Sequence, residues 1–166
     1  MTLGKKITPI TCGYYCMNQP FYEFTKTIEA LRYEFTSVGK HVIPKVVIFN
    51  TTDLSGIYSL TLANLLQDGS LDDITINDNG DMETILATVL QCINAFLEQY
   101  TKAIVAFSGS TIARTRLYRI AIARELQEAM NRFNIWGLTQ DAVEPFTPNR
   151  VYEGFLISLK SVNIVQ

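Results

Sequence analysis

The stretch that decides the fold is Ala103-Ile104-Val105-Ala106-Phe107-Ser108-Gly109-Ser110-Thr111, which leads into the arginine-rich residues 112–119. The continuous apolar run 103–107 predicts a short interior strand that is buried on both faces. Ser108-Gly109-Ser110 is typical of a turn. The apolar side chains of residues 111–133 recur at helical spacing, which predicts an amphipathic helix. A buried strand is therefore expected to pass through a small-residue turn directly into a helix.

Upstream of this stretch, the sequence predicts a run of strands before any helix. In residues 29–37, apolar and polar side chains alternate from Leu31 to Phe35. Gly39-Lys40 predicts a turn, and residues 46–49 form a β-branched and aromatic run. These segments are expected to pair as a hairpin. Further strands are expected at 57–62 and 71–76.

A first amphipathic helix is expected at 81–100, and short strands are expected at 135–138 and 151–159. The expected inner stripe of the second helix comprises Leu117, Tyr118, Ala121, Ile122, Leu126, Ala129, Met130 and Phe133. Because strands come in a run before helices alternate with them, the sequence favours an α+β fold. We expect a largely antiparallel sheet with two main helices packed on one face.

Length and composition fit one domain. The chain has 166 residues, of which 48% are hydrophobic, and no stretch approaches the roughly 20 apolar residues of a membrane span. Residues 1–20 predict an irregular N-terminal arm, and 21–166 a single α+β domain. Cys12, Cys16 and Cys92 are odd in number and no secretion signal is visible, so we expect free thiols, a cytoplasmic location and no membrane partner.

Several classes of chemistry are disfavoured. His41 is the only histidine, which makes a histidine-dependent triad or a histidine-ligated zinc enzyme improbable. Cys12 and Cys16 are not spaced as a zinc knuckle and have no second pair to complete it. The acidic residues between 68 and 83 lack the spacing of a calcium loop. We therefore expect no metal and no cofactor.

Charge is distributed unevenly along the chain. Residues 46–101 contain eight acids and no Lys or Arg, although the net charge of the whole chain is only −2. Five of the seven arginines lie on the second predicted helix: Arg114, Arg116, Arg119, Arg124 and Arg132. Two interpretations remain open: the acidic and basic faces pair with each other, or the arginines meet an external anion.

The turn before the second helix is the candidate site. Free backbone amides at a helix start attract anions, and Gly109 lets the backbone turn and approach a ligand closely. One of the nearby hydroxyls is expected to cap the helix. Helical geometry places Arg114 at the edge of the inner stripe, partly buried, where it needs an internal acid or a bound anion as a partner. The candidate anion-binding residues are Ser108, Gly109, Ser110, Thr111, Arg114, Arg116 and Arg119.

Three hypotheses about function follow, in order of preference. The first is a non-catalytic binding module for a phosphate-bearing ligand, either a nucleotide or a nucleic acid. The second is a protein-interaction or self-assembling module, in which the arginines pair with the acidic 68–83 region of another copy, to form a homo-oligomer, or with an acidic partner. The third is an enzyme that acts on phosphoesters through Ser108 or Ser110, which ranks last because the segment offers no base. No catalytic residue is assigned.

Residues 109–119 resemble the Gly-Ser-Thr-x-Ala-Arg-Thr-Arg-Leu-Tyr-Arg signature of an uncharacterised bacterial family, a domain of unknown function. Residues 78–81, 86–89 and 152–157 are also similar to this family. The resemblance spans about Met17 to Lys160. It implies a small α+β protein and carries over no activity. It also suggests that residues 1–16 extend beyond the usual start of the family.

Overall fold

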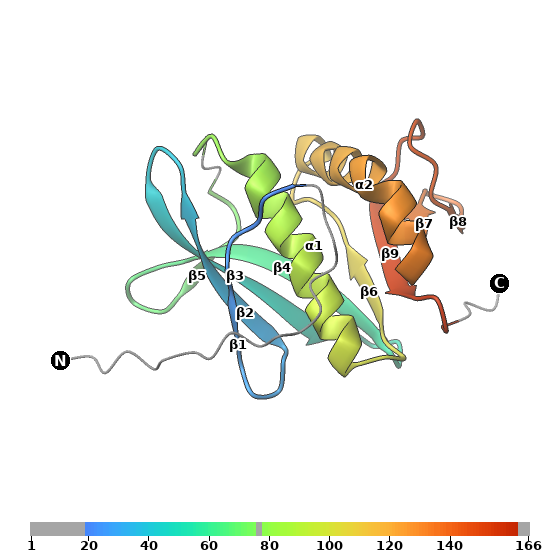
Figure 1. The fold of residues 1–166 in the computed structure, drawn as a ribbon, viewed down its shortest axis with the longest axis horizontal. Coiled ribbons are helices and arrows are strands. Elements are labelled where there is room, and N and C mark those ends of the chain that lie inside the picture. The colour runs from blue at the N-terminus through green and yellow to red at the C-terminus, as the bar shows by residue number, and fades with distance from the viewer. Residues whose placement is uncertain (1–18, 76–77, 163–166) are drawn as a thin grey trace.

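The computed structural model describes residues 19–75 and 78–162 (Figure 1). In these residues one sheet contains nine strands, in the order β1-β2-β3-β4-β6-β9-β7-β8, with β5 paired to β4. The elements are β1 (Thr25–Lys26), β2 (Arg32–Val38), β3 (Val42–Thr51), β4 (Ile57–Leu65), β5 (Leu71–Asp72), α1 (Met82–Gln99), β6 (Ile104–Phe107), α2 (Ile112–Arg132), β7 (Phe133–Leu138), β8 (Val143–Pro145) and β9 (Gly154–Leu159). Only β4 and β6 pair in parallel among these strands. The predicted α+β fold with a largely antiparallel sheet is confirmed.

Both helices cover the same face of the sheet. Figure 1 shows α1 crossing in front of the central strands with α2 beside it. Phe96 of α1 stacks on Phe49 of β3, with ring centroids 4.1 Å apart. Tyr118 of α2 meets Phe107 of β6 edge-on at 5.2 Å, and Phe107 contacts Phe155 of β9. These aromatic contacts, together with the aliphatic side chains around them, form the hydrophobic core.

The central stretch behaves largely as its sequence predicts. β6 lies between β4 and β9, and α2 begins after the turn that follows it. Val105 and Phe107 are fully enclosed on the helix side of the sheet, while Ile104 and Ala106 are half-buried. The strand is thus interior, but one of its faces is less deeply covered than expected.

The inner stripe of α2 differs in part from the expected one. Its buried residues are Thr115, Tyr118, Ile122, Glu125 and Ala129. Leu117 and Met130, which the sequence analysis placed inside, are 37% and 51% exposed. At about 100° per residue, Leu117 and Met130 lie on opposite edges of the stripe, roughly 100–120° from its centre, so the buried face is narrower than expected and leaves both side chains at the surface.

Short edge strands account for other differences. β1 and β8 were not expected, since two or three residues carry almost no periodic pattern. β8 includes Pro145, which an edge strand tolerates. The strand expected at 71–76 pairs only at Leu71 and Asp72, and residue 76 lies outside the described residues. The last strand starts at Gly154, not at residue 151. Tyr152, which precedes it, packs its ring into the space that a Cβ on Gly137 would occupy.

Three further predictions concern the N-terminal arm, the cysteines and membrane spans. The expected N-terminal arm lies almost wholly, and Cys12 and Cys16 lie entirely, outside the described residues. Cys92 is buried in α1 as a free thiol, and burial raises its pKa well above the usual value. Within the described ranges, neither helix is both long and apolar enough to cross a membrane.

Candidate anion-binding site

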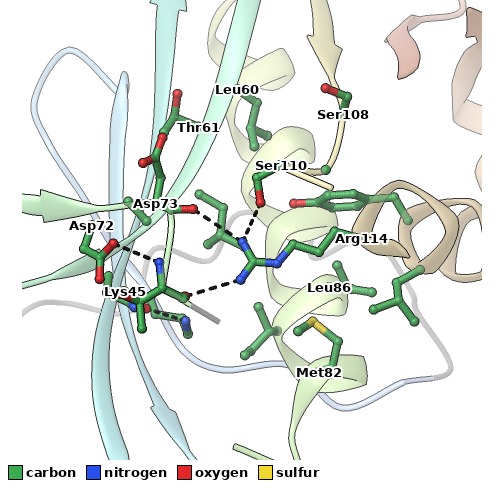
Figure 2. Close-up of a pocket in the computed structure, with 18 residues that line it drawn as sticks. Lys45, Leu60, Thr61, Asp72, Asp73, Met82, Leu86, Ser108, Ser110 and Arg114 are labelled. Carbon is green, nitrogen blue, oxygen red and sulfur yellow. Dashed lines mark hydrogen bonds between the residues drawn. The ribbon is translucent and has the colours of Figure 1, made fainter. Parts of the chain in front are cut away.

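A cavity of about 210 Å³ opens between the helix-covered face of the sheet and the starts of both helices (Figure 2). Lys45 of β3, residues 60–64 of β4 and residues 72, 73 and 75 line one side. The first turns of α1, the 108–110 turn and Arg114 line the other. We call this cavity the Lys45–Arg114 cleft. Segments far apart in the sequence therefore meet at one polar opening.

Lys45 enters the cleft from the sheet. It is opposite Asn64 on β4, and Asn64 is opposite Asp72 on β5, so the three residues form one row across three strands. Lys45 lies on the same face of β3 as Val47 and Phe49, which are both buried beneath the helices. Lys45 is itself only 8% exposed. Its Nζ donates a hydrogen bond to Asn64 Oδ1 at 2.7 Å. A cationic side chain is thus enclosed at the edge of the core.

The pKa of Lys45 lies below its ordinary value of 10.5, chiefly because burial disfavours the charged ammonium. The carboxylates of Asp81 and Asp72 act in the opposite direction, whereas the positive charge of Arg114 lowers the pKa further. Lys45 and Arg114 therefore repel each other across the cleft.

Arg114 reaches the cleft from the first turn of α2 and is half-buried. Its Nη1 donates to Ser110 Oγ at 2.7 Å and to the carbonyl oxygen of Asp73 at 3.4 Å, and Nη2 donates to the carbonyl oxygen of Thr75 at 3.3 Å. Figure 2 shows the guanidinium held between these groups above Met82 and Leu86 of α1. The contacts fix its position without neutralising its charge.

Asp72 and Asp73 also line the cleft, and the carboxylate of Asp72 is held by the backbone of its own loop. Asp72 Oδ1 accepts hydrogen bonds from the amides of Ile74 and Thr75 at 3.1 and 3.0 Å. Hydrogen bonds from Thr75 are the main reason why the pKa of Asp72 is lowered, and Arg114 contributes least. In residues 19–75 and 78–162, the ion pairs of the chain include neither Lys45 nor Arg114.

The turn before α2 is built mainly to hold the helix. Thr111 is the N-cap, and its Oγ1 accepts from the Arg114 amide at 3.2 Å, so one of the predicted hydroxyls does cap the helix. The Gly109 amide donates to Thr115 Oγ1 at 3.0 Å. A Cβ on Gly109 would lie 2.4 Å from the Thr115 amide nitrogen. The close approach that requires glycine is therefore to α2 itself, and this amide is already used.

The structure brings together part of the predicted residue set. Ser108, Gly109, Ser110 and Arg114 line the cleft, whereas Thr111, Arg116 and Arg119 are not among its lining residues. Nη1 of Arg119 donates to the carbonyl oxygen of Arg150 at 3.2 Å, and Arg116 is exposed.

Lys45 is the residue that the sequence analysis missed. The signal was present, because Lys45 is in phase with Val47 and Phe49 on an alternating strand. The phase predicts the face on which Lys45 lies. It does not predict that residues 108–114 fold next to Lys45 and line the same cavity.

Two further arginines of α2 are engaged within the chain. Arg124 pairs with Glu83 at 3.2 Å, and Arg132 pairs with Glu98 at 2.7 Å. The acidic segment and the arginine helix thus do pair with each other at these two points.

Asp81 and Tyr118 belong to the two helices that border the cleft. The side chain of Asp81, at the N-cap position of α1, accepts hydrogen bonds from the hydroxyls of Tyr22 and Ser37. Tyr118, which lines the cleft, is buried, and burial raises its pKa to about 12, so it is uncharged at neutral pH. The start of α1 is therefore tied to the β2–β3 hairpin.

Comparison with known proteins agrees with the family resemblance and adds no function. Neither a curated protein nor a solved structure gives a significant match. A family model matches residues 18–160, which include the whole cleft and all the strands and helices of the described part of the chain. The chain therefore belongs to the family of unknown function DUF6934.

Proposed function

We propose that the protein is a binding module for a phosphate-bearing ligand, which it holds in the Lys45–Arg114 cleft. One observation carries the proposal: two cationic side chains line one cavity, and within the described residues neither has a carboxylate ion-pair partner. Burying a charge without a counter-charge costs free energy. A bound anion would offset that cost.

The hydrogen bonds of Arg114 support this function. A guanidinium has five N–H donors, and the contacts to Ser110, Asp73 and Thr75 involve Nη1 and Nη2 but not Nε. Donors remain for a ligand, and the side chain is already fixed in place. Fixing a side chain before binding reduces the entropy that binding costs. Phosphate oxygens suit this planar set of donors, and Lys45 adds a second positive charge.

The size of the cleft favours a small ligand over a nucleic-acid strand. Its volume of about 210 Å³ is below the ~300–1,000 Å³ of pockets for drug-sized ligands. Arg124 and Arg132 pair with acids of the same chain, which leaves fewer arginines for a long polyanion. The Arg124 pair also weakens the self-assembly hypothesis, because it already occupies Glu83, one acid of the 68–83 region.

Titration calorimetry with inorganic phosphate and with a nucleoside monophosphate tests the proposal. We expect binding that weakens with added salt and at least tenfold loss of affinity in Arg114→Gln. Arg124→Gln is the matched control, because Arg124 lies on the same helix away from the cleft. Equal affinity in both variants, or no binding of either ligand to the wild-type protein, would overturn the proposal.

A further inference from the structure

We propose that the ligand of the Lys45–Arg114 cleft is a phosphorylated aldehyde or ketone, and that Nζ of Lys45 forms an imine with its carbonyl carbon. The inference rests on the proposed function and names the substrate class for the same site. It assigns different work to the two cations. Arg114 binds the phosphate, and Lys45 supplies an amine nucleophile.

The hydrogen bonding of Lys45 suits a nucleophile. Its one hydrogen-bond partner in the described part of the chain is Asn64 Oδ1, at 2.7 Å, and an amide oxygen is an acceptor. The neutral amine can keep this bond through one N–H while its lone pair remains free. A carboxylate in the place of Asn64 would instead hold Lys45 as a charged ammonium.

The charges that face Lys45 leave its proton weakly held. Burial and Arg114 lower the pKa of Lys45, and these effects outweigh the opposing carboxylates of Asp81 and Asp72. Tyr118, the other titratable group on the helix side of the cleft, is uncharged at neutral pH. Desolvation and a neighbouring cation are the two features that activate lysine for attack on carbonyl groups.

The groups that would hold the two ends of such a ligand lie on different sides of the cleft. Ser110 and Arg114 lie at the start of α2, whereas Lys45 enters from the sheet. Leu60, Leu62 and other apolar side chains lie between these two ends in the lining of the cleft. The volume of about 210 Å³ suits a compound of a few carbon atoms.

The reaction needs no oxidant or reductant. The Nζ lone pair attacks the carbonyl carbon, a C–N bond forms, and the carbonyl oxygen takes up a proton to give a carbinolamine. The nitrogen then loses its remaining proton as the hydroxyl leaves with a proton as water. The products are one imine and one water molecule.

Reductive trapping tests the proposal. The full chain is incubated with glyceraldehyde 3-phosphate, reduced with borohydride and analysed by intact-mass and peptide mass spectrometry. We expect one adduct per chain, located on Lys45. Trapping should be at least tenfold slower with glyceraldehyde, which lacks the phosphate, and inorganic phosphate should compete. Lys40 and Lys102 are exposed, so adducts on these two lysines measure non-specific reaction in the same sample.

Two variants separate this inference from the proposed function. Lys45→Arg keeps the positive charge and removes the primary amine, so it should still bind phosphate but give no adduct at position 45. Arg114→Gln should reduce trapping of the phosphorylated aldehyde to the rate of glyceraldehyde. Adducts spread over Lys40 and Lys102, or no adduct at all, would overturn the imine proposal. Phosphate binding without trapping would overturn the imine proposal and leave the proposed function standing. If Lys45→Arg fails to fold, mapping the adduct on the wild-type protein still shows whether Lys45 is the lysine that reacts.

Discussion

The helix-covered face of the sheet has two halves that differ in chemistry. In the aromatic half, Phe49 stacks on Phe96 and Phe107 packs against Phe155, and all four side chains have almost no exposed surface. In the other half, the same face carries Lys45, which points into the Lys45–Arg114 cleft.

The difference shows which part of the face serves stability and which part serves binding. Close-packed aromatic rings gain from burial and from ring geometry. An enclosed ammonium loses hydration and opposes folding unless an anion accompanies it. Substitutions of Phe96 and of Lys45 should therefore change stability in opposite directions, and four tests follow in order of decreasing effect.

The largest effect is expected in the aromatic half. Phe96→Ala removes a ring that is fully buried and stacked on Phe49, so we expect the free energy of unfolding to fall by about 3–5 kcal/mol. Urea denaturation measures the loss, and phosphate affinity of the folded fraction should be unchanged. Ile28→Ala, at a fully exposed side chain, is the control and should shift stability by less than about 0.5 kcal/mol. A small effect of Phe96→Ala would contradict the division into halves.

The next effect appears at high pH and concerns Tyr118, whose pKa rises from 10.0 to about 12 on burial. Between these values the unfolded chain has lost the phenolic proton that the folded protein retains, so stability falls as pH rises. By about pH 12, this group alone lowers the free energy of unfolding by roughly 3 kcal/mol, at about 1.4 kcal/mol per pH unit. Urea denaturation at pH 8 and pH 11 should show a smaller decrease for Tyr118→Phe than for the wild type. Equal decreases would show that Tyr118 ionises normally.

Gly109→Ala tests the junction between the cleft and α2. A Cβ at this position would lie 2.4 Å from the Thr115 amide nitrogen, and backbone must move to accommodate it. We expect the variant to lose about 1–3 kcal/mol of stability, the usual range for overpacking. Since the movement displaces the start of α2, phosphate affinity should fall as well. Unchanged thermal melting and unchanged affinity would show that the turn is not constrained as described.

The smallest effect on stability, and the one of opposite sign, is expected for Lys45→Met. The substitution replaces a buried ammonium by an apolar chain of similar length, so stability should stay the same or rise by about 1 kcal/mol. Phosphate affinity should nevertheless fall at least tenfold. Urea denaturation and calorimetry on the same sample measure both quantities. A variant that is strongly destabilised and still binds phosphate would reverse the assigned roles of the two halves.

Local sequence patterns predicted most of the fold. The apolar run 103–107 and the stripe of α1 specify an interior strand and a buried helix without any knowledge of their partners. Prediction was weaker where few residues carry the pattern, as in β1 and β8, or where packing against the sheet sets how wide the buried face of a helix is. Leu117 and Met130, on opposite edges of the α2 stripe, were misplaced for that second reason.

The candidate site was predictable only on the side that is continuous in sequence. Ser108, Ser110 and Arg114 were found because they lie within one strand–turn–helix segment. Lys45 comes from a hairpin more than 60 residues away, and only the strand order of the folded sheet places it beside them. The roles of Gly109 and Thr115 were hidden because both depend on contact between a backbone turn and the helix that follows it.

The central claim is that the Lys45–Arg114 cleft binds an anion through Arg114, and a crystal structure of the protein soaked in tungstate tests it most directly. Tungstate has the charge and shape of a phosphate dianion, and its anomalous signal identifies it without ambiguity. We expect one tungstate inside the cleft in contact with the guanidinium of Arg114, and no such site in crystals of Arg114→Gln. An empty cleft beside tungstate bound elsewhere, for example at Arg116, would contradict it.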